Sequence, residues 1–202
     1  MSDPETISLR QEHRDTTRRR IVTAARRVFI KKGYTKATIE DIIAAARVSR
    51  ATLYLHFDSK LDLMHAAAEK MAAEGYDAAR RLAMVLTQGD RADLRAWVEE
   101  SLAYYNRHRP MALAAREAEL SADKPSDQLR NYLEYMEPWV ETWPANRRTE
   151  ARMRFELCRL QMHHYMWGTS PALFSDEAPP VDLFTEMWWT TLKEPLISPT
   201  QN

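Results

Sequence analysis

Apolar residues recur along this chain at intervals of three and four positions, which is the spacing of one face of an α-helix. The first such stripe lies between Thr17 and Gly33, and glycine commonly follows the last turn of a helix. Its members are Ile21, Ala24, Ala25, Val28 and Phe29. Only 4 of the 202 residues are glycine, so the chain has little material for the tight turns of an all-β fold. The pattern predicts an all-α protein.

Three further helices are expected next along the chain, each opened by a Thr or Ser capping residue. Thr38 precedes Asp41 by three positions, the spacing of a capping box. Ser49 opens the next helix after a break of only three residues, and Ser59 opens a long helix that runs to about residue 86 as one rigid lever. Two short helices joined by a three-residue turn, behind a first helix rich in arginine, are typical of a helix-turn-helix.

The helix that follows Ser49 is expected to turn one face inward and to offer the other to a partner. Leu53 and Phe57 lie about 40° apart at 100° per residue, so they share the inward face. Ala51 and Leu55 fall on the opposite face, which carries no acidic residue. A small Ala51 allows close approach to a groove, and Leu55, like Thr52 beside it, can contact a thymine methyl group.

The net charge of zero hides an asymmetry between the two parts of the chain. Residues 1–60 contain 13 Lys and Arg against 7 Asp and Glu, whereas residues 61–202 contain 16 against 22. All six tryptophans lie beyond residue 96. Such a division indicates a basic N-terminal module with a polyanionic partner, carried on an acidic body.

The run TIEDIIAAARVSRATLYLHFDSKLDL resembles the N-terminal domain of the TetR family of transcriptional repressors, over about residues 17–65. The matching positions are Thr38, Val48, Ser49, Thr52, Leu53, Tyr54, His56, Phe57, Lys60 and Leu63. Arg47 departs from the pattern, because the family commonly has glycine there. That position often suits a positive φ, so we expect a strained or altered turn at Arg47 and treat its side chain as a candidate phosphate contact.

The resemblance implies that the module binds double-stranded DNA. Thr38, Tyr54, His56 and Lys60 would contact phosphates. The residues facing base edges would be Ser49, Arg50, Ala51, Thr52 and Leu55. Tyr54 could instead be a half-buried packing residue and His56 a satisfied histidine at a helix end. The arginines at 18–20 could form a solvated face or an ordered arm in the minor groove.

The remainder of the chain is predicted to form five more helices, about nine in all. They are a helix opened by Asp90 and broken at Pro110, a helix from Met111 to about Leu120, one opened at Pro125 and bent at Pro138, one from Pro144 to Trp167, and one from Val181 to about Glu194. The expected division is a flexible arm (1–16), a helix-turn-helix domain (17–62) and a ligand-binding and dimerisation domain (63–202).

The helix ending at Trp167 is apolar over two thirds of its circumference, so it must be covered on two sides. Its first stripe is Met153, Leu157, Leu160, His164 and Trp167, and its second is Ala151, Phe155, Cys158, Met162 and Tyr165. One stripe would pack in the domain core and the other against a second subunit. In the TetR-like fold the last two helices usually form the homodimer interface, and a dimer would place two reading helices on an inverted repeat.

The body also contains many aromatic and methionine side chains, which a hydrophobic or aromatic inducer could contact. The candidate ligand-binding residues are Trp97, Tyr104, Tyr105, Met136, Trp139, Met162, His164 and Trp167. Each of them taken singly could equally be core or interface. His164 lies on an apolar stripe and is the better pocket candidate, whereas His163 is expected to face solvent.

No motif of an enzyme, metal site or cofactor site stands out, so we expect no catalysis, metal or cofactor. No run of 18 apolar residues exists, the first 20 residues are polar, and there is one cysteine. We therefore expect a cytoplasmic protein with no membrane span. The favoured function is a repressor that a small-molecule inducer releases from its operator. A helical protein-interaction module and an activator of the same fold are the alternatives.

Overall fold

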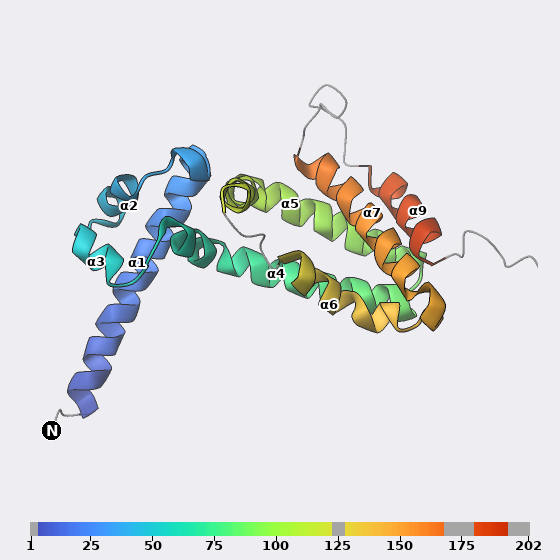
Figure 1. The fold of residues 1–202 in the computed structure, drawn as a ribbon, viewed down its shortest axis with the longest axis horizontal. Helices are drawn as coiled ribbons and strands as arrows, with labels where there is room; N and C mark the ends of the chain where they lie inside the picture. The colour runs from blue at the N-terminus through green and yellow to red at the C-terminus, as the bar shows by residue number, and fades with distance from the viewer. Residues whose placement is uncertain (1–3, 123–127, 168–179, 194–202) are drawn as a thin grey trace, which may run out of the picture. The chain divides into compact units, whose positions relative to one another are not determined.

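The computed structural model describes residues 4–122, 128–167 and 180–193, and within these ranges the chain forms helices and no strand (Figure 1). The elements are α1 (Pro4–Lys36), α2 (Ile39–Ala46), α3 (Arg50–Tyr54), α4 (Lys60–Gln88), α5 (Arg91–Leu120), α6 (Gln128–Val140), the 3-10 helix η1 (Ala145–Arg147), α7 (Arg148–Trp167) and α9 (Val181–Leu192). The all-α class and the N-terminal helix-turn-helix are confirmed.

Helix α1 is longer than the sequence pattern predicted. It begins at Pro4, so in place of the arm expected over residues 1–16 the described part of that segment is helical. No glycine or proline interrupts it before Gly33, and Gln11 donates a hydrogen bond to Asp15 one turn later (3.0 Å). At Gly33 the backbone leaves the helical conformation, with φ 75° and ψ 170°. The helix is therefore kinked at the residue where the sequence pattern predicted its end.

Helix α5 replaces two predicted helices. Pro110 was expected to end one helix and begin another, yet α5 continues through it from Arg91 to Leu120. A proline removes one N–H donor and tends to bend a helix, but it does not by itself end one when packing on both sides holds the two halves. The described ranges therefore contain eight α-helices rather than nine.

The chain divides into two compact units that do not follow the expected boundary between residues 62 and 63. The first comprises residues 1–72 and 110–125, and the second residues 73–109 and 126–202. The end of α5 joins the first unit because its apolar face packs there and because Glu117 accepts a hydrogen bond from the backbone N–H of Thr35 (2.9 Å).

The core of the first unit is made by the predicted inward faces. Leu53 of α3 is fully buried and Phe57 nearly so, as the helical angles predicted. They pack with Ile21 and Phe29 of α1 and with Met111 of α5. This core fixes α2 and α3 against α1, so that the opposite face of α3 stays exposed.

The second unit is held by a core rich in aromatic residues. Trp97 and Trp188 pack with their ring centroids 5.2 Å apart, and Trp139 is almost completely buried. The stripe of α7 that runs from Ala151 through Met162 lies in this core. None of the described helices is long and apolar enough to span a membrane.

Candidate nucleic-acid interface

Helix α2 begins with the predicted capping box. The Thr38 hydroxyl accepts a hydrogen bond from the backbone N–H of Asp41, and the Asp41 carboxylate accepts one from the backbone N–H of Thr38 (both 3.1 Å). Lys32 donates to the other oxygen of Asp41 (2.6 Å). This contact with Lys32, followed by the bonds to Thr38, lowers the pKa of the Asp41 carboxyl. The N-terminus of α2 is therefore rigidly placed at an exposed Thr38.

The turn between α2 and α3 has the left-handed backbone that the family resemblance implied at Arg47. Arg47 has φ 51° and ψ 51°, and its N–H bonds back to the carbonyls of Ile43 and Ala44. A left-handed conformation costs a side-chain-bearing residue about 1–2 kcal/mol. The Arg47 side chain is exposed and has no hydrogen-bond or ion-pair partner among the described residues, so it is free to contact an anion.

Ser49 caps α3 as predicted. Its hydroxyl accepts a hydrogen bond from the backbone N–H of Thr52 (3.0 Å) and also pairs with the Thr52 hydroxyl (2.8 Å). Ala51 is exposed, Tyr54 is 43% exposed and Leu55 is 69% exposed. Leu55 directly follows this short helix, and the hydroxyl groups of Ser49 and Thr52 lie at its start. An exposed surface with both apolar and hydroxyl side chains suits contact with DNA bases.

One acidic residue on this surface was missed from the sequence. Glu40, in the first turn of α2, forms an ion pair with Arg50 of α3, and both side chains are more than half exposed. The Arg50 guanidinium also lies over the Tyr54 ring, 6.0 Å from its centroid. Arg50 is thus held between a carboxylate and an aromatic ring. The pair joins an acidic residue of one short helix to a basic residue of the next. A comparison of charges between neighbouring helices, rather than within one helix, would have revealed it.

The start of α4 is tied to α1. The Lys60 ammonium donates to the carbonyl oxygens of Tyr34 (2.9 Å) and Ala37 (3.1 Å) and lies 4.2 Å from the centroid of the Tyr34 ring. Lys60 therefore has a structural role in addition to the predicted phosphate contact. His56 is half-buried, and burial lowers the pKa of its imidazole, with Arg14 and Arg18 lowering it further.

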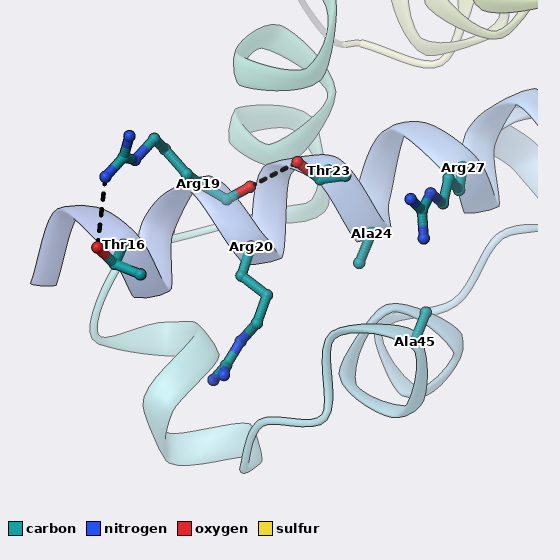
Figure 2. A pocket seen from close by; sticks show the side chains of 7 residues that line it. All are labelled: Thr16, Arg19, Arg20, Thr23, Ala24, Arg27 and Ala45. Carbon is teal, nitrogen blue, oxygen red and sulfur yellow. Dashed lines mark hydrogen bonds between the residues drawn. The ribbon is translucent and has the colours of Figure 1, made fainter. Parts of the chain in front are cut away.

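The arginines at 18–20 lie within α1 and form neither a free arm nor one uniform face. Arg18 stacks over the ring of Phe57, 5.1 Å from its centroid. Arg19 and Arg20 line a groove between α1 and α2, together with Arg27 (Figure 2). The helix continues through this segment because its arginines are good helix formers with no interrupting glycine or proline.

The predicted ligand-binding residues divide into core and surface. Trp97, Met136, Trp139 and Met162 are buried together in the second unit. Tyr104 and Tyr105 are half-buried with their rings edge to face, 5.2 Å apart. The side chain of Trp167 lies outside the described residues.

The two neighbouring histidines of α7 have the opposite solvent exposure to the one predicted. His164 is exposed, whereas His163 is partly buried between the Tyr105 hydroxyl (3.2 Å) and the Arg159 guanidinium (3.1 Å). The physical reason is that the stripe carrying His164 is the uncovered one: Met153 is 63% and Leu157 58% exposed.

His108 and Glu74 were also missed. The His108 ring is buried, its Nε2 lies 2.9 Å from the Glu74 carboxylate, and the Tyr104 ring packs on it at 4.7 Å. Its Nδ1 is buried without a partner among the described residues. Cys158 is buried as well, and burial raises the pKa of its thiol to about 12. No group of three or more potential metal ligands occurs among the described residues.

The helix-turn-helix segment matches a known family. Residues 21–67 fit the family described as bacterial regulatory proteins, tetR family. The helix-turn-helix segment is thus similar to the DNA-binding domain of the TetR family. A crystal structure of a TetR-family protein from Mesorhizobium loti MAFF303099 has the same fold, with a TM-score of 0.51 at 16% identity over 89% of this chain and 94% of that one.

Curated relatives are similar to part of the chain. The regulator TtgR of Pseudomonas putida is 39% identical over 56 residues, which are 28% of this chain and 27% of TtgR. The activator FasR of Mycolicibacterium smegmatis is 37% identical over 86 residues (43% and 39%), and the repressor NicS of Pseudomonas putida 34% over 100 residues (50% and 47%). The chain thus spans less than half the length of each of these relatives.

Proposed function

We propose that this chain is a homodimeric transcriptional repressor that binds an inverted-repeat operator and leaves it when a small hydrophobic or aromatic molecule binds. The observation that carries the proposal is the surface formed by α2 and α3. There Thr38 and Ser49 hold two helix N-termini in place while Ala51 and Leu55 remain uncovered. Helix α3 is buried on one side only, and its own exposed face carries no acidic residue, which is the arrangement that enters a major groove. The one acidic neighbour described above, Glu40 of α2, is paired with Arg50.

In this function the residues have separate tasks. Thr38 and the exposed Tyr54 would hold phosphates, with His56 beside them, so that α3 has a fixed register on the duplex. Arg50, Thr52 and Leu55 would meet base edges. Arg50 can donate two hydrogen bonds from its guanidinium group to the O6 and N7 acceptors of guanine, and Leu55 can contact a thymine methyl group.

The uncovered face of α7 supports the homodimer. Met153, Leu157 and Leu160 are 63%, 58% and 49% exposed, and Leu183 of α9 is 58% exposed. Large apolar side chains in a row on one helix are costly to leave in water, and such patches mark protein interfaces. A second copy, joined through the same two helices by a two-fold axis, would cover both patches at once.

The polar and aromatic group around His108 supports the response to a ligand. His108 Nδ1 is buried without a partner among the described residues, while Tyr104 packs on the same ring. Glu74 holds the other ring nitrogen. A few fixed polar atoms among aromatic side chains are typical of sites that bind small apolar molecules. Binding there would favour a body conformation with weaker DNA affinity.

Selection of bound sites from a random duplex library, at near-physiological salt, tests the DNA-binding function. An enriched inverted repeat would support a dimeric reader, and an enriched single half-site would contradict the dimer. Binding without any sequence preference would leave the helical protein-interaction module as the better function.

The sign of the regulation needs a second assay, because FasR is an activator. The enriched sequence placed over a promoter should lower reporter output in the presence of this protein. Increased output would make the chain an activator.

A further inference from the structure

The groove between α1 and α2 in the first unit has a volume of about 460 Å³ and is strongly basic (Figure 2). Arg19, Arg20 and Arg27 line it, with Thr16 and Thr23, and the lining contains no acidic residue. None of these side chains belongs to the surface of α2 and α3 described above. The groove is a separate concentration of positive charge.

Two of its three arginines are unused by the fold. Arg19 donates to the Thr16 hydroxyl (3.3 Å), but Arg20 and Arg27 have no hydrogen-bond or ion-pair partner among the described residues. They lie seven residues apart, which is two turns or about 10.5 Å along the helix. In Figure 2 both extend from α1 toward the side on which Ala45 lies. They therefore face one groove with their donors available.

An anion would relieve the repulsion between these guanidinium groups and satisfy their donors. The planar fork of a guanidinium fits two oxygens of a phosphate, and charge-assisted bonds of this kind are among the stronger ones at a protein surface. An open groove suits a chain of phosphates better than an enclosed metabolite, because it can follow an extended backbone.

We propose that this groove binds phosphate groups, and that they belong to the DNA backbone flanking the bases that α3 reads. We favour DNA as the source of these phosphates because the groove adjoins the turn into α3. Ala45 lines the groove, and the exposed Arg47 of that turn follows two residues later. A strand that passes the N-terminus of α3 thus meets a basic path into the groove. This choice of source rests on the proposed DNA-binding function, whereas the phosphate site itself does not.

The salt dependence of DNA binding tests the site in the full chain. Each lost phosphate contact lowers the slope of log affinity against log salt by about 0.9. The slope should therefore fall by about 0.9 in Arg27→Gln and by about 1.8 in the Arg20→Gln/Arg27→Gln double variant, with unchanged base preference. Lys70→Gln, a change of the same charge at an exposed position on α4, should leave the slope as it is. All three positions are exposed, so the variants should fold.

Two further arms separate the sources of phosphate. Trimming the duplex to the half-sites should abolish the difference between the wild type and the double variant. Titration with tripolyphosphate, without DNA, should shift the Arg20 and Arg27 side-chain resonances if the groove accepts a free anion. This arm remains informative even if the chain binds no DNA.

The outcomes are distinct. A smaller slope in the groove variants alone supports the DNA source. Tripolyphosphate binding that depends on Arg20 and Arg27, with an unchanged slope, supports the phosphate site and overturns the DNA source. An unchanged slope together with no tripolyphosphate binding, or an equal loss in Lys70→Gln, overturns the proposal.

Discussion

Glu40 is an acidic residue on the DNA-binding surface that we propose for α2 and α3. It places a negative charge where phosphates would approach, and at the same time it holds Arg50, whose other side lies on Tyr54. A carboxylate in that place disfavours binding to any duplex that does not engage Arg50. It can also accept a hydrogen bond from the amino group of cytosine. We therefore expect Glu40 to affect the discrimination between the operator and other DNA sequences more than the affinity for the operator.

Glu40→Gln should raise affinity for a scrambled duplex by about twofold to fivefold, the range of an exposed charge interaction. The preference for the selected operator over the scrambled duplex should fall, because Arg50 loses its anchor. Fluorescence anisotropy with both duplexes at one salt concentration measures this ratio. Glu69→Gln, an exposed change of the same charge on α4, is the control. An unchanged ratio in Glu40→Gln would show that Glu40 does not position Arg50.

His56 provides a second prediction at this scale. Burial and the charges of Arg14 and Arg18 lower its pKa in the free protein below the usual 6.5, while Asp15 acts in the opposite direction. A neighbouring phosphate favours the charged imidazole and so raises its pKa in the complex. DNA affinity should therefore rise as the pH falls through the pKa of the complex toward that of the free protein, by about twofold to fivefold.

Anisotropy titrations between about pH 7.5 and 5.5 at constant ionic strength measure this change, since the ordinary histidine pKa lies inside that range. His56→Gln should remove the pH-dependent increment while keeping the base preference. An increment of the same size in the variant would assign it to another group.

At the scale of elements, the sequence pattern was most reliable where a few neighbouring residues decide the outcome. The caps at Thr38 and Ser49 form as predicted, because each needs only a hydroxyl and the N–H groups of the next turn. Pro110 shows the opposite case. Whether a proline ends a helix depends on what packs beside it, and that information lies elsewhere in the chain.

The two glycines Gly33 and Gly75 should respond oppositely to alanine. At Gly33 the backbone has φ 75°, and an added Cβ would lie 2.9 Å from the Glu117 carboxylate. Gly33→Ala should lower the free energy of unfolding by about 1–2 kcal/mol. Gly75 is inside α4, where an added Cβ meets only the Tyr104 hydroxyl at 3.4 Å, so Gly75→Ala should be neutral or stabilise by up to about 1 kcal/mol.

Thermal and urea unfolding monitored by circular dichroism compare the two variants with the wild type. Destabilisation by Gly75→Ala equal to that by Gly33→Ala would mean that the left-handed kink at Gly33 is unimportant.

At the scale of the whole molecule, the exposed face of α7 sets the oligomeric state that we propose. Leu157→Glu places a charge on a side chain that is 58% exposed in the single chain, so the fold should tolerate it. In a dimer joined through α7 the same charge would be buried at high cost. Sedimentation should then show a monomer, and operator affinity should fall about 100-fold or more, because one chain can hold only one half-site.

Leu120→Glu is the matched control, since Leu120 is 79% exposed at the end of α5 and lies outside this face. It should leave both the sedimentation and the operator affinity as in the wild type. A dimer of normal stability in Leu157→Glu would place the interface elsewhere.

The amino-acid sequence alone determined the helical class, the helix-turn-helix, its caps and the inward face of Leu53 and Phe57. These depend on local periodicity and on interactions within one or two turns, which neighbouring residues encode. The positive φ at Arg47 was expected from the resemblance to the TetR family, which commonly has glycine at this position.

Only the tertiary structure decided which stripe of α7 is buried, and with it that His163 rather than His164 is covered. Both stripes are apolar, so periodicity could not choose between them; the packing of α9 and of the aromatic core did. The Glu40–Arg50 pair and the α1–α2 groove likewise come from residues on different helices. Their chemistry depends on distances across the fold, which no spacing along the chain contains.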